Sequence, residues 1–252
     1  KDYVLGVKDL SVTFGTEFGY VEAVKNVNFG VRPGEIVAVV GESGSGKSVT
    51  AMTALGLSPR NAIIEGQTFV GGQDVGKLSA EKKRKIRGSD VAMIFQEPMT
   101  ALNPVLRVGD QIMEALSVHD IAYGKKAQDR AIELLEMVGI PNAKKRFREY
   151  PHQFSGGQRQ RIVIAIAIAC GPKVIIADEP TTALDFTVQA EILDLMRSLK
   201  DKLNTGILLI THHMGVVADM ADRVVVMLKG EIVESGTVHQ VLQRPEHPYT
   251  QR

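Results

Sequence analysis

The chain has 252 residues, 44% of them hydrophobic, which predicts one large α/β domain or a core domain with an insert. Its 30 Lys and Arg residues nearly balance 29 Asp and Glu residues, which argues against a nucleic-acid-binding groove, because such grooves carry a clustered basic excess. The single cysteine, Cys170, excludes a disulfide framework within the chain, and the longest apolar run, residues 162–170, is far shorter than the ~20 residues that span a bilayer. These features predict a protein of the reducing cytosol whose role at any membrane depends on a partner.

The first predicted elements are strands. Residues 10–14 and 20–31 alternate between apolar and polar side chains, with glycines 15 and 19 between them, and predict an antiparallel hairpin. Short apolar runs without alternation then recur along the chain, which is typical of strands buried on both faces of a parallel sheet. These runs are residues 36–40, 91–95, 174–177, 207–210 and 224–228.

The middle of the chain, from about residue 99 to residue 151, is patterned for helices. Apolar residues at three- and four-residue spacing share one face in residues 112–116 and again in residues 131–138, and Gly139 is placed to end the second helix. Another helix is predicted over residues 188–199. We therefore expect an α/β fold with a mostly parallel sheet, an N-terminal antiparallel β subdomain and a helical insert.

Residues 41–48 fit the complete G-x-x-x-x-G-K-[ST] pattern of a nucleoside triphosphate site. They follow the predicted strand 36–40 and lead into a predicted helix, and this order favours the site over a glycine-rich turn without a ligand. The glycines allow backbone N–H groups to surround phosphate oxygens, Lys47 can reach the β- and γ-phosphates, and the Ser48 hydroxyl can bind Mg²⁺. The candidate nucleotide-binding residues are Gly41, Glu42, Ser43, Gly44, Ser45, Gly46, Lys47, Ser48 and Val49.

Two carboxylates end another predicted strand. Asp178 and Glu179 follow the apolar residues 174–177, and chemistry gathers at the carboxyl ends of the strands in an open parallel sheet. Asp178 is placed to hold the Mg²⁺ shell, and Glu179 to orient and deprotonate the attacking water. An acidic strand end in solvent is the alternative reading, and the presence of residues 41–48 favours catalysis over it. The second carboxylate indicates hydrolysis rather than nucleotide binding alone.

A second glycine motif, Ser155-Gly156-Gly157-Gln158, opens a helix-prone run to Cys170. Taken alone, it is a capped helix start that offers a second anion cradle. With Phe154 in the position where Leu is usual, it resembles the signature motif of the ABC transporter ATPases. Together with residues 41–48 and the two carboxylates, the resemblance covers nearly the whole chain and implies the ABC ATPase fold. In that family two domains meet head to tail, and each signature motif caps the γ-phosphate bound by its partner, so hydrolysis requires a dimer.

The resemblance implies roles for further residues. Gln96 resembles the Q-loop glutamine that senses Mg²⁺ or the lytic water, Asp185 lies in a D-loop-like segment at the dimer interface, and His212 resembles the switch histidine that contacts the γ-phosphate. Phe14 is the first choice for stacking on adenine, and Tyr20 is the alternative. Taken alone, a Gln or His at the end of a strand is more often a polar group with its hydrogen bonds satisfied than a residue that binds a ligand. Only the order of all the motifs along the chain favours a role in the site.

The same resemblance implies three parts of the chain. Residues 1–98 form the first part of the ATP-binding core with the antiparallel β subdomain, residues 99–157 form the helical subdomain ending in the signature motif, and residues 158–252 complete the core.

Three segments resemble the branch of the family that imports oligopeptides, dipeptides and nickel: residues 48–51, 95–104 and 247–250. This implies an ATPase subunit, with ATP and Mg²⁺ as cofactors, that energises an importer of oligopeptides or dipeptides; nickel or another small solute is the alternative. The implied partners are a second ATPase subunit, identical or distinct, transmembrane permease subunits and an extracytoplasmic solute-binding protein. The expected location is peripheral, on the cytoplasmic face of the cell membrane, without nucleic acid.

The sequence departs from that branch at two positions: Phe186 replaces a smaller β-branched residue, and His213 replaces Asp. Because a histidine titrates near neutrality, His213 could make γ-phosphate sensing pH-dependent. DNA-repair ATPases with a related ATPase domain are disfavoured, because neither sustained heptads nor cysteine pairs lie between the two glycine motifs. Translation factors of the family are disfavoured because they carry two ATPase cassettes in one chain, and this sequence contains one. A non-hydrolysing partner is disfavoured because the chain contains all four expected residues: Lys47, Gln96, Glu179 and His212.

Overall fold

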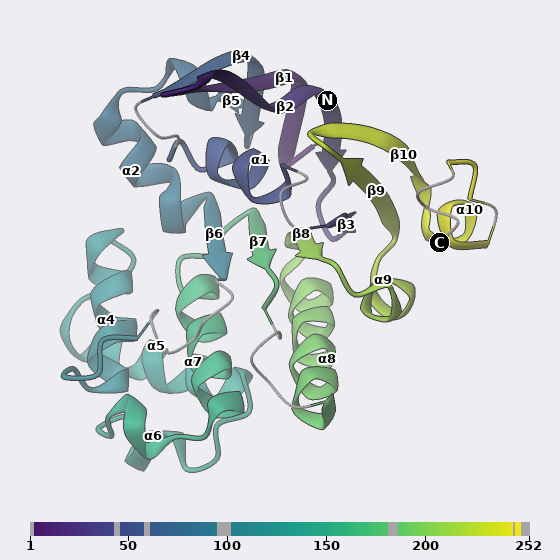
Figure 1. Cartoon of the computed structure of the whole chain (residues 1–252). Coiled ribbons are helices and arrows are strands. Elements are labelled where there is room, and N and C mark those ends of the chain that lie inside the picture. Colours follow the sequence, from purple (N-terminus) through teal and green to yellow (C-terminus); the bar gives the residue numbers. More distant parts are fainter. Residues whose placement is uncertain are drawn as a thin grey trace. The chain divides into compact units, whose positions relative to one another are not determined.

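The computed structural model describes residues 3–42, 46–57, 61–94, 102–180, 186–243 and 245–247. The chain divides into two compact units. Unit 1 comprises Lys1–Arg84 and Asn204–Arg252, and unit 2 comprises Lys85–Leu203. Figure 1 labels the helices and strands of both units.

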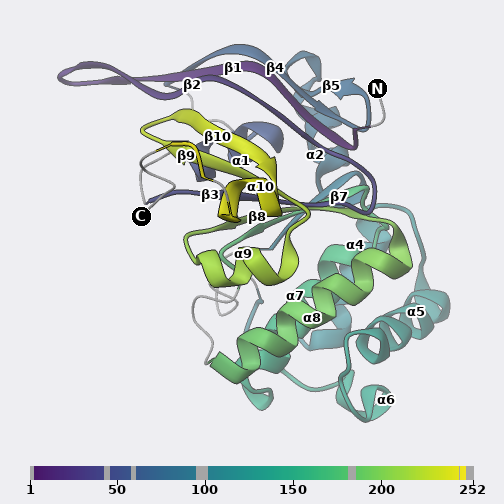
Figure 2. The same cartoon turned by 90° about the vertical axis from the view of Figure 1, so that its right-hand side faces the viewer.

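Unit 1 begins with an antiparallel sheet in the order β2-β1-β4-β5. Its strands are β1 (Leu5–Thr16), β2 (Gly19–Val31), β4 (Ala62–Val70) and β5 (Gln73–Asp74). The predicted hairpin of β1 and β2 is confirmed, and Figure 2 shows its tip extending away from the rest of unit 1. β4 was not predicted, because much of it is exposed and Gly66, in the left-handed region with φ 88°, interrupts its alternation.

Unit 1 also contains a mixed sheet portion in the order β10-β9-β3-β8. The strands β3 (Ile36–Val40), β8 (Gly206–Thr211) and β9 (Arg223–Leu228) are parallel and carry the apolar runs that predicted them. Every residue of β3 and β8 is buried, as expected for strands covered on both faces. β10 (Glu231–Thr237) is antiparallel to β9 and half exposed, so its sequence lacked the apolar run by which the others were found.

Short helices complete unit 1. They are α1 (Lys47–Ala54), the 3₁₀ helix η1 (Val75–Lys77), α2 (Ala80–Ser89, in which the boundary between the units falls), α9 (Met214–Met220) and α10 (Val238–Gln243). The start of β3 is fixed by a long-range hydrogen bond, in which the Ile36 N–H donates to the Asp222 carboxylate at 2.9 Å. This bond holds β3, the strand that leads into the glycine-rich segment, next to the start of β9.

Unit 2 combines a parallel strand pair with helices. The strands are β6 (Val91–Ile94) and β7 (Val174–Asp178), and the helices are α4 (Val108–Val118), α5 (Gly124–Met137), α6 (Ala143–Arg146), the 3₁₀ helix η2 (Pro151–Gln153), α7 (Gly156–Ile168) and α8 (Phe186–Leu203). The predicted helical faces are buried, including Ile112, Leu116 and Leu134, and Gly139 (φ 82°) follows α5 as predicted. The predicted division of the chain at residues 98 and 157 remains a prediction.

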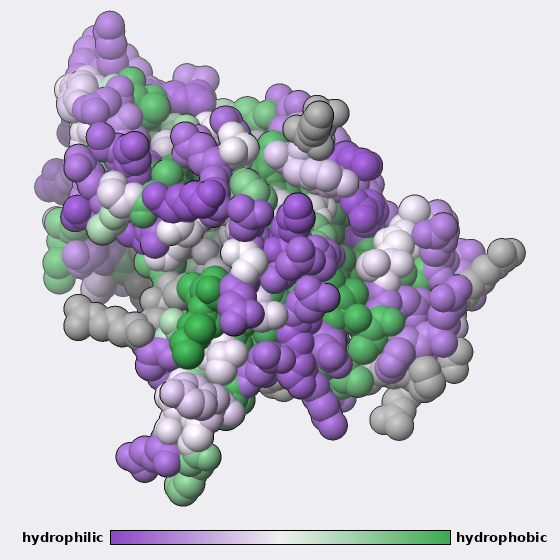
Figure 3. All heavy atoms as spheres, turned by 90° about the horizontal axis from the view of Figure 1, so that it is seen from above, coloured by the Kyte–Doolittle hydropathy of each residue, from purple (hydrophilic) through white to green (hydrophobic). Residues whose placement is uncertain are grey.

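Among the described residues, none of the helices is long and apolar enough to cross a bilayer. On the face shown in Figure 3, hydrophilic side chains predominate and apolar residues stand in small groups.

Candidate active site

The glycine-rich segment of unit 1 joins the buried strand β3 to helix α1. Gly46, the residue before α1, has φ 95°, and an alanine Cβ there would lie 2.7 Å from the carbonyl oxygen of Ala23 in β2. Both the left-handed backbone and the close approach of β2 therefore require glycine at this position. Residues 43–45, which include the candidates Ser43, Gly44 and Ser45, lie outside the described residues.

Lys47 is the first residue of α1 and is only 7% exposed. Its ammonium group donates a hydrogen bond to the Gly41 carbonyl at 2.5 Å, which closes the segment between β3 and α1. Ser48 is exposed in the first turn of the helix, where backbone N–H groups and the helix dipole favour an anion. Glu42 is also exposed, and Val49 is half-buried.

His212 lies at the same edge of unit 1 as the glycine-rich segment. Thr211 at the end of β8 pairs with Val40 at the end of β3, so His212 and Gly41 each follow a residue of the same parallel pair. His212 is exposed, and its ring centroid lies 4.0 Å from that of His213. The strand register therefore places both histidines at the carboxyl edge where ligands bind in open α/β sheets.

The two candidate aromatic residues lie on opposite faces of the β1–β2 hairpin. Phe14 pairs with Val21 and Tyr20 pairs with Gly15, and successive pairs along a hairpin point to opposite faces. Phe14 shares its face with the fully buried Val12 and is half-buried, whereas Tyr20 is 76% exposed. One adenine ring at this hairpin can therefore stack on one of the two aromatics but not on both.

In unit 2, β7 ends in the two predicted carboxylates. Asp178 is its last residue, and both Asp178 and Glu179 are half-buried. Glu179 has φ 46°, which a non-glycine residue rarely adopts, and it precedes Pro180, which further restricts its backbone. Such strain persists only where the surrounding structure holds it, and it is concentrated at functional sites. This conformation was not predicted from the sequence.

The second glycine motif forms the start of α7. The Ser155 hydroxyl accepts a hydrogen bond from the Gln158 N–H at 3.2 Å, and the Gln158 side chain accepts one from the Ser155 N–H at 3.0 Å. This reciprocal capping box satisfies two donors at the helix start. Ser155 and Gly156 are exposed, and Gly157 has no room for a Cβ, because Val188 of α8 lies against it.

Phe154, just before the cap, is buried, and the Arg146 guanidinium lies 4.2 Å from its ring centroid. The phenyl ring therefore anchors the chain directly before the exposed turn, as a buried leucine would.

One buried polar residue of unit 2 was not identified from the sequence. Gln160 on α7 is fully buried, and its amide nitrogen donates to the Pro180 carbonyl at 2.7 Å. Helical spacing places it on the same face as the buried residues Ile164 and Ala167, and that periodicity was the available signal.

Two further candidates, Gln96 and Asp185, lie outside the described residues. Unit 1 and unit 2 each contain a part of the predicted site: Gly41, Gly46, Lys47, Ser48 and His212 in unit 1, and Ser155, Gly156, Gly157, Gln158, Asp178 and Glu179 in unit 2.

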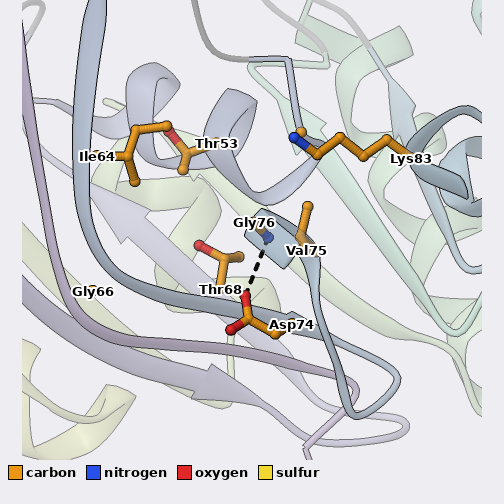
Figure 4. Close-up of a pocket in the computed structure, with 9 residues that line it drawn as sticks. Thr53, Ile64, Gly66, Thr68, Asp74, Val75, Gly76 and Lys83 are labelled. Carbon is orange, nitrogen blue, oxygen red and sulfur yellow. Dashed lines mark hydrogen bonds between the residues drawn. The ribbon is translucent and has the colours of Figure 1, made fainter. Parts of the chain in front are cut away.

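A small cavity in unit 1 is separate from these candidates. It has a volume of about 50 Å³ and is lined by Thr53, Gly56, Ile64, Gly66, Thr68, Asp74, Val75, Gly76 and Lys83 (Figure 4). Inside it, an Asp74 carboxylate oxygen accepts from the Gly76 N–H at 3.1 Å. Since ligand pockets usually measure about 300–1,000 Å³, this cavity is too small for a nucleotide.

The described residues contain no cluster of three or more His, Cys, Asp or Glu side chains suited to a metal ion. The Ser48 hydroxyl in unit 1 and the Asp178 carboxylate in unit 2 are each oxygen ligands of the kind that Mg²⁺ prefers. Mg²⁺ is commonly bound by one or two protein groups together with substrate phosphates, and Ser48, beside the glycine-rich segment, is chemically suited to such binding.

Comparison with known proteins gives one family model, described as ABC transporter, that matches residues 24–182. The chain is 51% identical to the oligopeptide transport ATP-binding protein OppD of Bacillus subtilis, over 98% of this chain and 70% of OppD. It is also 51% identical to the dipeptide transport ATP-binding protein DppD of Lactococcus lactis, over 99% of this chain and 72% of DppD.

Solved structures match over most of the chain as well. An ATP-binding cassette, MJ0796, solved as a dimer in a post-hydrolysis state bound to ADP and Pi, has a TM-score of 0.80 and 28% identity, and the match covers 93% of this chain and 98% of the cassette. CbiO1 from Clostridium perfringens, part of the transporter complex cbiONQ, has a TM-score of 0.82 and 27% identity over 97% of this chain and 92% of its own. These matches confirm the predicted fold class.

Proposed function

This chain belongs to the ABC transporter family, and we propose from that premise that it is the ATP-hydrolysing subunit of an importer for oligopeptides or dipeptides. The ATPase activity is supported above all by the start of α1, where the left-handed Gly46 and the buried Lys47 follow the buried strand β3, an arrangement suited to binding phosphates. The peptide substrate is supported by half-identical relatives named for oligopeptide and dipeptide transport, which match this chain over nearly its full length.

In the proposed mechanism, the phosphates of ATP bind to the backbone of residues 41–48. The Lys47 ammonium exchanges the Gly41 carbonyl, its present partner at 2.5 Å, for the β- and γ-phosphate oxygens. Ser48 and Gln96 would hold Mg²⁺, with Asp178 in its coordination shell, and the ion would neutralise charge on the phosphates. Phe14 is the better candidate for stacking on adenine, because it is half-buried on the inner face of the hairpin.

Glu179 is proposed as the general base that orients the attacking water and accepts its proton. His212 would contact the γ-phosphate from the edge that it shares with Gly41. Catalysis then consists mainly of positioning and of charge stabilisation at the phosphates, because phosphoryl transfer leaves little covalent chemistry to the protein.

We further propose that a complete site requires two ATPase subunits. The exposed helix start at Ser155, with its two glycines, supports contact with a γ-phosphate bound by another subunit, and Asp185 would lie at that interface. A related cassette whose structure is a dimer bound to ADP and Pi is consistent with this arrangement. The second subunit is either identical or a distinct ATPase.

The transport step would require further partners. We propose permease subunits in the membrane, a solute-binding protein outside it, and a peripheral location for this chain on the cytoplasmic face. The near balance of acidic and basic residues supports a function without nucleic acid.

Glu179→Gln tests this proposal. The variant should bind ATP like the wild type, lose nearly all steady-state turnover, and accumulate as an ATP-bound dimer in light scattering, because the amide keeps the shape of the side chain but cannot accept the proton. Glu133→Gln, which alters a surface residue paired with Arg130, is the matched control and should hydrolyse ATP normally. Normal turnover by Glu179→Gln would show that the assignment of the base is wrong.

A further inference from the structure

Gln160 links helix α7 to the turn that follows β7. It is fully buried, and its amide lies 2.7 Å from the Pro180 carbonyl oxygen. A carbonyl can only accept, so the side-chain nitrogen must be the group that faces it. The hydrogen bond joins residues 20 positions apart in the sequence, and both belong to unit 2.

The turn that Gln160 holds contains the strained residue of the site. Glu179 adopts φ 46° directly before Pro180. A positive φ is unfavourable for a residue with a side chain, and a following proline restricts the backbone further. Pro180 has no N–H, so its carbonyl is the only backbone group of Pro180 that can take part in a hydrogen bond. Gln160 binds that group.

The hydrogen-bonding capacity of Gln160 is used on one side only. Its amide nitrogen satisfies the buried Pro180 carbonyl, whereas its Oε1 atom is closed to solvent and has no hydrogen-bond partner among the described residues. A buried acceptor without a partner destabilises a fold, so part of the stability gained at the Pro180 carbonyl is lost at Oε1. The contact that this glutamine makes is therefore specifically the one to Pro180.

We propose that Gln160 is a positioning residue, which holds the Pro180 carbonyl and thereby fixes the backbone orientation of Glu179 for the activation of water. The inference rests on the proposed function, in which Glu179 is the general base. It also gives α7 a second role, since the same helix carries Ser155 at its N-cap and Gln160 in its second turn. The contact with a partner's nucleotide and the orientation of the base would then depend on one rigid element.

The first test is Gln160→Met, which keeps a long unbranched side chain and removes the donor. With the full-length subunit in its assembled complex, kcat for ATP should fall on the order of 10- to 100-fold, because small displacements of a catalytic group have effects of this size. The Michaelis constant and the dissociation constant for ATP should stay within about twofold, since Gln160 does not contact the nucleotide in this account. Ile164→Val, which shortens another buried residue of α7, is the control and should lower thermal stability without lowering kcat.

A second variant, Gln160→Glu, makes the donor to the Pro180 carbonyl depend on pH. The introduced carboxyl donates to the Pro180 carbonyl only when it is protonated, and burial raises the pKa of a carboxyl group. The ratio of kcat in Gln160→Glu to kcat in the wild type should therefore rise as the pH falls from about 8 to about 6. A ratio that is constant over this range would overturn the proposal.

The double variant Gln160→Met/Glu179→Gln separates this inference from the function on which it rests. If Gln160 acts through Glu179, Gln160→Met should leave the small residual turnover of Glu179→Gln unchanged. An additional loss equal to that in the wild-type background would overturn the positioning role, as would a Gln160→Met single variant with wild-type kcat. If Glu179→Gln itself turned over normally, the assignment of the general base would fail instead.

Discussion

The capping box at the start of α7 makes a quantitative prediction for Ser155→Ala. The substitution removes the hydroxyl that accepts from the Gln158 N–H at 3.2 Å, and it leaves no cavity because Ser155 is exposed. The expected loss is therefore that of an N-cap, about 1 kcal/mol. For a chain of this length, each kcal/mol lowers the melting temperature by about 2–4 °C, so a decrease of about 2–4 °C is expected.

The assay is thermal unfolding of the subunit without nucleotide, by calorimetry or intrinsic fluorescence, alongside ATP turnover. Ser155→Asp is the matched control, because aspartate caps helices as well as serine and its charge suits the positive end of the helix. It should keep the melting temperature within about 1 °C of the wild type. It should nevertheless lose turnover, because in the proposed dimer the new carboxylate would face a γ-phosphate.

The reasoning would be refuted if Ser155→Ala melted at the wild-type temperature. It would also be refuted if Ser155→Asp lowered the melting temperature as much as Ser155→Ala. Either result would mean that the side chain does not stabilise the helix start by accepting from Gln158.

The other predictions concern unit 1. Gly46→Ala should destabilise the fold by about 2–5 kcal/mol, since it adds an alanine with a left-handed backbone and a close contact with the Ala23 carbonyl. Gly72→Ala, at φ 85° with open space around it, is the control and should destabilise the fold by only about 1–2 kcal/mol. Equal losses of stability in chemical denaturation would count against the close approach of Ala23 to Gly46. Phe14→Ala should weaken ATP binding by about 0.5–1.5 kcal/mol or more and raise the Michaelis constant more than it lowers kcat. Tyr20→Ala should change neither the affinity for ATP nor the Michaelis constant. If nucleotide titration showed that only Tyr20→Ala weakened binding, the assignment of Phe14 would be reversed.

The sequence was most informative where burial is continuous. β3, β8 and β9 were predicted because strands covered on both faces need uninterrupted apolar side chains. The glycine pattern at 41–48 could be recognised because it fits the complete motif of nucleoside triphosphate sites. β4 and β10 were missed because exposed or half-exposed strands place fewer demands on their side chains. Neither strand carries the glycine-rich segment, so missing them did not affect the candidate site.

Features set by tertiary contacts could not be predicted in this way. The positive φ of Glu179 depends on what holds the following turn, and local sequence before a proline argues against that conformation. Gln160 lies in a polar stretch in which only the preceding residues, with the two glycines, were interpreted as functional. The opposite placement of Phe14 and Tyr20 likewise required the observed register of the hairpin, in which Thr16 pairs with Gly19. Strand alternation then places the two rings on opposite faces.

The central claim is that ATP hydrolysis by this chain drives the import of peptides, and uptake of a radiolabelled oligopeptide or dipeptide by the native cells tests it most directly. Cells whose only copy of the subunit carries Glu179→Gln should lose uptake of the labelled peptide and keep uptake of a free amino acid that enters by another route. The same loss should occur with Lys47→Ala, which removes the ammonium group proposed to bind the phosphates, and wild-type uptake should return with the unaltered subunit. Undiminished peptide uptake in the Glu179→Gln cells would contradict the account.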